Sequence, residues 1–305
     1  MPDELSTPDA LPTLGELPTL GELRRRLDAA DYLVDDGLAM ALFLGMSLGQ
    51  PVLLEGEPGV GKTAAAKALA QALDTRFIRL QCYEGIDTSE ALYEWNYPRQ
   101  LLSIRLAEAT GDAVSEADLF DASFLLDRPL LQALRHDGPR PPVLLIDEID
   151  RADDEFEALL FEFLGEQSVT IPELGTVHAD RPPIVILTSN RSRELHDALK
   201  RRCFYHWIDY PDVDAAAGIV RRRVAGSSDS LVRAATAFVG EVRALELDKA
   251  PGLAEAIDWV SALQLLGVSE LDRSATLATL GALAKTPDDL ATMRAHVDAG
   301  AEPLP

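Results

Sequence analysis

The stretch from Val52 to Leu73 constrains the fold more than any other part of the chain. It runs from an apolar segment, Val52–Leu54, into the glycine-rich loop GEPGVGKT at residues 56–63, and then into the helix-forming residues Ala64–Leu73. The loop fits the phosphate-binding pattern G-x-x-x-x-G-K-[ST] at every fixed position. A chance glycine turn would need neither the strand before the loop nor the helix after it. The order strand, loop, helix therefore predicts a phosphate-binding loop.

The residue types of this loop suit a nucleoside triphosphate. Gly56, Gly59 and Gly61 let backbone N–H groups curl around phosphate oxygens, which a β-carbon would obstruct. Lys62 is expected to reach the β- and γ-phosphates, and Thr63 to ligate Mg²⁺. ATP and Mg²⁺ are thus the expected cofactors. The predicted nucleotide-binding residues are Gly56, Glu57, Pro58, Gly59, Val60, Gly61, Lys62, Thr63 and Ala64.

Apolar runs that alternate with helical segments predict an α/β fold. Such an alternation is typical of a parallel sheet covered by helices on both sides, here of five strands. The predicted strands are Val52–Leu54, Phe77–Leu80, Val143–Ile146, Ile184–Leu187 and Phe204–Ile208. Two further segments, Ser168–Ile171 and Gly175–His178, alternate in polarity as a β-hairpin would.

The character of the chain changes near Pro211. After this residue there are alanine- and leucine-rich segments without strand-like runs, which predicts a small helical bundle. The expected helices are Asp214–Val224, Ser230–Arg243, Leu253–Leu265, Ser274–Ala284 and Pro287–Ala299. We therefore divide the chain into a poorly ordered N-terminal tail (1–22), an α/β nucleotide-binding domain (23–211) and a helical domain (212–305).

Composition argues against some partners and compartments. There are 28 basic and 51 acidic residues, a net charge of −23 that would repel nucleic acid and anionic membranes. Cys82 and Cys203 lie outside any metal-binding spacing, which favours two reduced, partly buried thiols. The apolar run Leu38–Leu48 is too short to span a bilayer, and no secretion signal is evident. We expect a cytoplasmic protein with no stable membrane insertion and no nucleic-acid partner.

Polar residues follow two of the predicted strands. Asp147, after the strand Val143–Ile146, is placed to coordinate Mg²⁺, and Glu148 to orient and deprotonate the attacking water. Acids at such a place also favour the start of a helix, and we assign Asp150 and Asp153–Glu155 to that structural role. Asn190, after the strand Ile184–Leu187, could hold the attacking water, or it could be a turn residue that bonds its own backbone.

A basic pair, Arg201 and Arg202, precedes the last strand. One of these arginines could reach the γ-phosphate of a neighbouring subunit and stabilise the charge of the transition state. A solvated loop is the structural alternative. We favour Arg202 because it lies nearer to the strand, and leave the choice between the two open.

Together these elements resemble the AAA+ ATPases, with Gly56–Thr63 as Walker A, Val143–Glu148 as Walker B, Asn190 as sensor 1 and Arg201 or Arg202 as the arginine finger. The loop sequence, the segment DEIDRA at 147–152 and the hairpin before Asn190 are similar to the MoxR family. The segments 87–97 and 201–211 are most similar to the subgroup associated with maturation of molybdenum-containing carbon monoxide dehydrogenase.

The resemblance implies an AAA+ P-loop NTPase fold with an all-α lid domain and catalytic roles for Lys62 and Glu148. It also implies self-assembly into a ring, usually a hexamer. A von Willebrand A domain protein would be a partner, and a metalloenzyme such as a molybdenum hydroxylase would be the client of a chaperone. At the place where relatives carry a sensor 2 arginine, the chain reads KAPGLAE at 249–255, so no such residue is assigned and Lys249 is the one substitute.

Two other functions share the same motifs. A motor or loader acting on nucleic acid would use the same phosphate loop and acids, although the charge of −23 counts against it. A scaffold could bind ATP and assemble without useful turnover, but Glu148 argues for hydrolysis.

Overall fold

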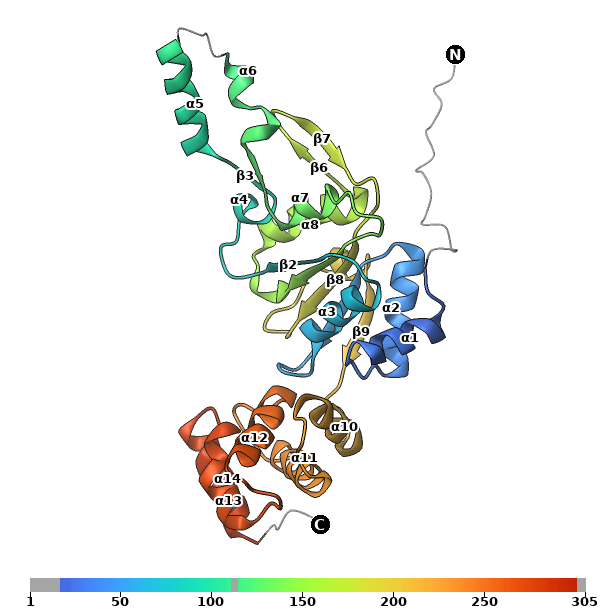
Figure 1. The fold of residues 1–305 in the computed structure, drawn as a ribbon, viewed down its shortest axis with the longest axis vertical. Helices are drawn as coiled ribbons and strands as arrows, with labels where there is room; N and C mark the ends of the chain where they lie inside the picture. The colour runs from blue at the N-terminus through green and yellow to red at the C-terminus, as the bar shows by residue number, and fades with distance from the viewer. Residues whose placement is uncertain (1–16, 111–114, 301–305) are drawn as a thin grey trace. The chain divides into compact units, whose positions relative to one another are not determined.

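The computed structural model describes residues 17–110 and 115–300, which form two units (Figure 1). The first unit takes in the residues up to Ala30, Val34–Glu55 and Ala65–His206. The second takes in Asp31–Leu33, Gly56–Ala64 and the residues from Trp207 onwards. The phosphate-loop residues therefore group with the helical part of the chain.

A five-stranded parallel sheet with the order β2-β5-β8-β1-β9 is the framework of the α/β part. Its strands are β1 Val52–Gly56, β2 Phe77–Gln81, β5 Val143–Asp147, β8 Ile184–Ser189 and β9 Phe204–Ile208. All five predicted strands are confirmed, and so is the α/β class. β1, β5 and β8 are fully or almost fully buried along their length, as expected for strands covered on both faces.

The connections place the helices on the two faces of the sheet. From β1 to β2 the chain crosses the sheet in one direction through α3 (Lys62–Ala72), and from β2 to β5 and then β8 it returns. Right-handed crossovers consequently put α3 on the face opposite to α7 (Pro129–Leu134) and α8 (Asp154–Glu166). Leu130 of α7 and Leu160 of α8 belong to one buried cluster with Leu144 of β5, which agrees with this arrangement.

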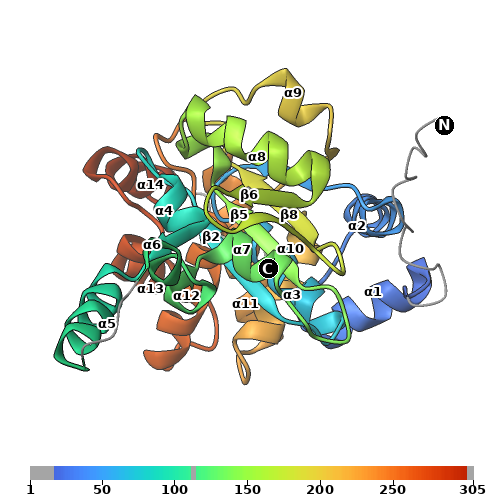
Figure 2. The same cartoon turned by 90° about the horizontal axis from the view of Figure 1, so that it is seen from above.

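Between β2 and α7 lies a segment whose strands the sequence did not reveal. β3 (Tyr93–Trp95) pairs antiparallel with β4 (Leu125–Asp127), and both views show α5 (Tyr97–Thr110) lying apart from the sheet (Figures 1 and 2). Trp95 packs edge-on against Phe120, with ring centroids 5.1 Å apart. The segment also holds α4 (Thr88–Ala91), α6 (Glu116–Leu119) and the 3-10 turn Ala122–Phe124. The acidic connector predicted around residues 111–112 lies outside the described residues.

The remaining elements of the first unit follow their sequence signals. α1 begins at Leu20 after the cap residue Thr19, so the last residues of the expected tail are helical, while residues 1–16 lie outside the described residues. Asp35 caps α2 by accepting from the backbone N–H of Leu38 at 2.8 Å. The predicted hairpin is confirmed. The bounds are α1 Leu20–Ala29, α2 Asp36–Leu48, β6 Ser168–Ile171, β7 Gly175–His178 and α9 Asp197–Lys200.

The helices of the second unit surround a core centred on Trp259 and Phe238, both fully buried. The helices are α10 Val213–Arg223, α11 Asp229–Arg243, α12 Leu253–Leu265, α13 Arg273–Thr279 and α14 Pro287–Asp298. The prediction of one helix over Ser274–Ala284 is wrong, because α13 gives way to a 3-10 turn at Leu280–Ala282. Thr279, the last residue of α13, accepts a bond from the indole N–H of Trp259 at 2.7 Å.

Both cysteines are free thiols, as expected. Burial raises the pKa of Cys82 to about 12, with a further contribution from Asp147, and burial alone raises that of Cys203 to about 12. Neither thiol is therefore a nucleophile near neutral pH. Within residues 17–110 and 115–300, no helix has the length and apolar character needed to cross a bilayer.

Candidate functional site

The phosphate loop has the backbone that its glycines allow. Gly59 and Gly61 have φ angles of +80° and +100°, a left-handed region that is costly for other residues. At Gly56 a β-carbon would lie 2.4 Å from the carbonyl oxygen of Ile208, so this position also excludes a side chain. The loop is therefore a curl of backbone that carries no β-carbon at these three positions, as a phosphate cradle requires.

Lys62 begins α3 directly after this curl. Its side chain is buried, and its ammonium donates to the carbonyl oxygens of Gly56 and Glu57, each at 2.7 Å. The cation is thereby held across the mouth of the loop, at the positive end of an 11-residue helix. A buried ammonium beside a helix N-terminus is a site for an anion, and a polyphosphate fits it.

Asp147 ends β5 and is almost completely buried, with 2% of its surface exposed. Its Oδ1 accepts a hydrogen bond from the Thr188 hydroxyl at 2.5 Å, and its Oδ2 accepts from Nε and Nη2 of Arg79 at 2.9 and 2.6 Å. Thr188 reaches Asp147 because β5 and β8 are neighbouring parallel strands. The ion pair with Arg79, on the other neighbouring strand, could not be predicted from spacing along the chain.

Glu148 follows at the sharp turn after β5. Its backbone is left-handed, with φ 56° and ψ 49°, and its N–H donates to the Thr188 hydroxyl at 2.9 Å. Its carboxylate pairs with Nε of Arg151 at 2.9 Å and keeps 31% of its side-chain surface exposed. The turn therefore aims the carboxylate away from the strand while the backbone is bound to β8, an arrangement that suits a general base.

Asp150 organises the loop that contains Asn190. It accepts from the backbone N–H of Asn190 at 3.2 Å and from the N–H and hydroxyl of Ser192 at 2.8 and 2.6 Å. Burial acts to raise the pKa of Asp150, but these hydrogen bonds outweigh it and hold the pKa below 3.8. Asp150 also lies in the first turn of the 3-10 helix Ile149–Arg151, in agreement with its assignment to a helix start, and Asp153 caps α8 by accepting from Phe156 N–H.

The two members of the basic pair, Arg201 and Arg202, have different environments. Arg202 donates to the carbonyl of Phe161 at 2.8 Å, and its guanidinium carbon lies 5.5 Å from the centre of that ring. Arg201 is exposed, and its side chain makes no hydrogen bond or ion pair within the part of the chain that the structure describes. Arg202 is therefore held within its own chain, whereas Arg201 has no such bond.

The donor set for a metal ion is small. No group of three or more His, Cys, Asp or Glu side chains that could hold a metal occurs in residues 17–110 and 115–300. Mg²⁺ bound to a nucleotide does not need one, because it keeps several waters and takes phosphate oxygens as ligands. Taken separately, the buried carboxylate of Asp147 and the hydroxyl of Thr63 are each oxygen donors of the type that this ion prefers.

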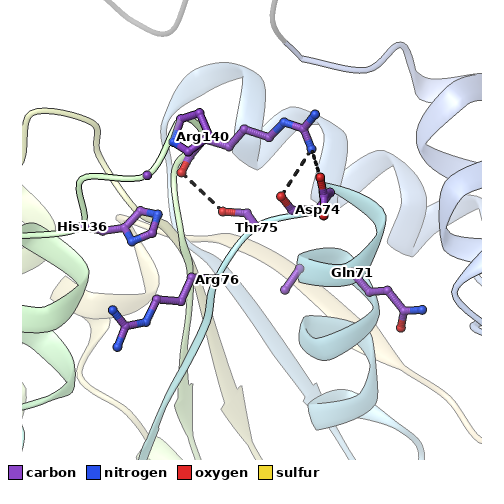
Figure 3. Close-up of a pocket in the computed structure, with 9 residues that line it drawn as sticks. Gln71, Asp74, Thr75, Arg76, His136 and Arg140 are labelled. Atoms are coloured by element: carbon purple, nitrogen blue, oxygen red, sulfur yellow. Dashed lines mark hydrogen bonds and ion pairs between the residues drawn. The ribbon is translucent and has the colours of Figure 1, made fainter.

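A hollow of about 310 Å³ lies at the N-terminal ends of strands β2 and β5 (Figure 3). Arg140 spans it by donating to the carbonyl of Leu73 at 2.6 Å and to the Asp74 carboxylate at 3.1 Å, so it caps the end of α3. The hydroxyl of Thr75 donates to the carbonyl of Pro141 at 2.8 Å. These contacts join α3 to β5 and give the hollow a structural role.

The fold and these residues define a nucleotide-binding protein with a phosphate loop. Residues 52–210, just over half of the chain, match the family described as "ATPase family associated with various cellular activities (AAA)". The chain belongs to the AAA family.

The individual proteins to which the chain is similar share only a small part of its sequence. The chain is 25% identical over 213 residues to uncharacterized proteins of Staphylococcus aureus strains bovine RF122 / ET3-1 and USA300, which covers 68% of this chain and 72% of each relative. Among solved structures, the RuvB Holliday junction branch migration motor of Thermotoga maritima is 17% identical, covers 88% of this chain and 70% of its own, and has a TM-score of 0.48.

Proposed function

We propose that the protein hydrolyses ATP with the help of Mg²⁺. The observation that carries this proposal is the buried Lys62, whose ammonium lies across a curl of glycine backbone. A cation held at this curl, beside the N-terminus of α3, is placed to bind a polyphosphate. Membership of the AAA family supports the same conclusion.

The acids of β5 would supply the chemistry. Asp147 would hold the Mg²⁺ together with Thr63, and the ion would neutralise charge on the phosphate oxygens. Glu148, which is partly exposed and oriented by its turn, would take the proton of the attacking water. Asn190, whose loop is fixed by Asp150, would position that water.

Two variants test this proposal. Lys62→Ala should abolish ATP binding, and Glu148→Gln should abolish phosphate release while ADP and ATP still bind. We would measure phosphate release colorimetrically and nucleotide binding by isothermal titration calorimetry. An unchanged rate for Glu148→Gln would remove Glu148 from the mechanism. Binding and assembly without turnover in the unmodified protein would favour the scaffold function.

We further propose that the protein acts as a ring, usually a hexamer, in which an arginine of one subunit acts on the nucleotide of the next. Arg201 suits this role better than Arg202, because Arg202 is bound to Phe161 of its own subunit. An arginine supplied from a neighbour would make hydrolysis depend on assembly. Light scattering in the presence of ATP would report the ring size.

The similarity of the loop, the 147–152 segment and the hairpin to the MoxR family supports a narrower proposal. The protein would be a chaperone that works with a von Willebrand A domain protein on a metalloenzyme, for which a molybdenum hydroxylase is the candidate. The test is co-purification: a von Willebrand A protein encoded beside this chain should bind it in an ATP-dependent way. Failure to bind any such protein would leave the ATPase proposal standing and remove the chaperone role.

The charge of −23 supports the absence of a nucleic-acid partner. We would measure ATP hydrolysis with and without single- and double-stranded DNA at physiological salt. Strong stimulation by either form would replace the chaperone proposal with a nucleic-acid motor or loader.

A further inference from the structure

A lid arginine that the sequence did not single out is bound to the phosphate loop. Arg243 stands at the end of α11, and its Nη2 donates to the carboxylate of Glu57, the second residue of the loop. Its Nη1 donates to the carbonyl of Pro251 at 2.7 Å, just before α12. The loop touches the same place a second time, because the backbone N–H of Leu253 donates to the carbonyl of Gly59 at 3.2 Å.

The surroundings of Arg243 give it few alternatives to Glu57. Its side chain is only 13% exposed, and its guanidinium carbon lies 3.9 Å from the centre of the Tyr210 ring. Burial raises the pKa of Tyr210 to about 12, with Arg243 opposing the shift, so the phenol is neutral and cannot balance the cation. Glu57 is the one carboxylate paired with Arg243 in the described part of the chain.

The position of Glu57 is unusual for its charge. Lys62 donates to the carbonyl of Glu57, so this residue is part of the curl that would receive phosphate. The side chain of Glu57 is 56% exposed, and its carboxylate repels a polyphosphate anion unless a cation balances the charge. Arg243 supplies that cation from a residue 186 positions away.

We propose that Arg243 is a positioning residue that neutralises Glu57 and ties the phosphate loop to the start of α12, so that the loop can accept a nucleotide. This inference rests on the proposed nucleotide binding. It gives the lid a contact with the loop that does not need an arginine at the start of α12.

The test is a cycle of variants whose affinity for ADP with Mg²⁺ is measured by isothermal titration calorimetry. Arg243→Gln should weaken ADP binding by about tenfold, the effect of one unbalanced charge near a phosphate at an intermediate dielectric. The double variant Glu57→Gln/Arg243→Gln should regain most of that affinity. Glu57→Gln alone keeps an oxygen that accepts from Arg243, and it should tighten ADP binding because the cation is no longer balanced.

The dependence of ADP affinity on salt concentration distinguishes charge neutralisation by Arg243 from simple packing of its side chain. The loss caused by Arg243→Gln should shrink between low and 500 mM salt, where the Debye length is only about 4 Å, because charge repulsion is screened and packing is not. Arg233→Gln is the matched control on α11, since Arg233 is 63% exposed and lies 3.6 Å from Asp214. It should bind ADP as the unmodified protein does.

The binding measurements can overturn either the role proposed for Arg243 or nucleotide binding itself. An equal loss in Arg243→Gln and in the double variant, independent of salt, would show that Arg243 only packs the lid and would overturn the proposal. If Arg243→Gln does not fold, an unchanged or weakened affinity of Glu57→Gln would overturn it. Failure of the unmodified protein to bind ADP or ATP would instead refute nucleotide binding itself. Normal binding by Arg243→Gln would refute only this inference.

Discussion

Thr188 should be a larger determinant of stability than its size suggests. It is 1% exposed, donates to the Asp147 carboxylate at 2.5 Å, and accepts from the Glu148 N–H at 2.9 Å. Thr188→Val keeps the shape and removes both bonds. A hydrogen bond to a charged group contributes about 1.5–3 kcal/mol, and a buried N–H left without a partner costs about 1–3 kcal/mol. Because water can partly replace the second partner, we expect a loss of about 2–4 kcal/mol in total.

The assay is urea unfolding, combined with hydrogen exchange of the Glu148 amide, which should become faster in the variant. Thr170→Val is the matched control, because Thr170 is an exposed residue of β6 and its hydroxyl bonds that of Thr176 at 3.1 Å. It should change the free energy of unfolding by less than about 0.5 kcal/mol. A change that small for Thr188→Val, with Glu148 exchange unaltered, would refute the account of the β5–β8 edge.

Three further predictions concern other residues. Asp150→Asn should lower the free energy of unfolding by about 1–3 kcal/mol at pH 7. Because the pKa of Asp150 is lowered from 3.8, this difference from the unmodified protein should persist above pH 3.8 and shrink as the pH falls below it. Acid unfolding of the two proteins would measure the difference. Arg201→Ala should abolish ATP hydrolysis in the assembled protein and regain some when mixed with Glu148→Gln subunits, whereas Arg202→Ala should mainly lower stability; the reverse pattern would return the finger to Arg202. Cys82 and Cys203 should resist iodoacetamide at pH 8 in the folded protein, since both thiols have a pKa of about 12. Rapid labelling of either cysteine, detected by mass spectrometry, would contradict its burial.

The strands of the sheet could be predicted because a buried parallel strand needs an uninterrupted apolar run, and proline or glycine marks its ends. Val143–Ile146 and Ile184–Leu187 are such runs, and their order along the chain placed Asp147 and Asn190 at one edge of the sheet. By contrast, β3 and β4 have three residues each, too few for a periodic signal, and they pair residues far apart in the chain, such as Trp95 and Leu125.

The contacts that the sequence missed all join residues distant in the chain. Arg79 reaches Asp147 across 68 positions, Asp150 reaches Ser192 across 42, and Arg243 reaches Glu57 across 186. No local pattern distinguishes these residues from ordinary surface charges. Arg243 in particular reads as a favourable cation at the C-terminal end of a helix, which explains its place without any role in the loop.

The left-handed backbone of Glu148 destabilises the folded protein, so glutamate would be retained at this position only under selection for activity. Such a conformation disfavours a residue with a β-carbon by about 1–2 kcal/mol, and asparagine or glycine adopts it more readily. Glu148→Asn or Glu148→Gly should therefore give a protein that is at least as stable as the original and catalytically dead. If so, drift would tend to replace the proposed general base first, and inactive descendants of this fold would be recognised by asparagine or glycine at this one turn.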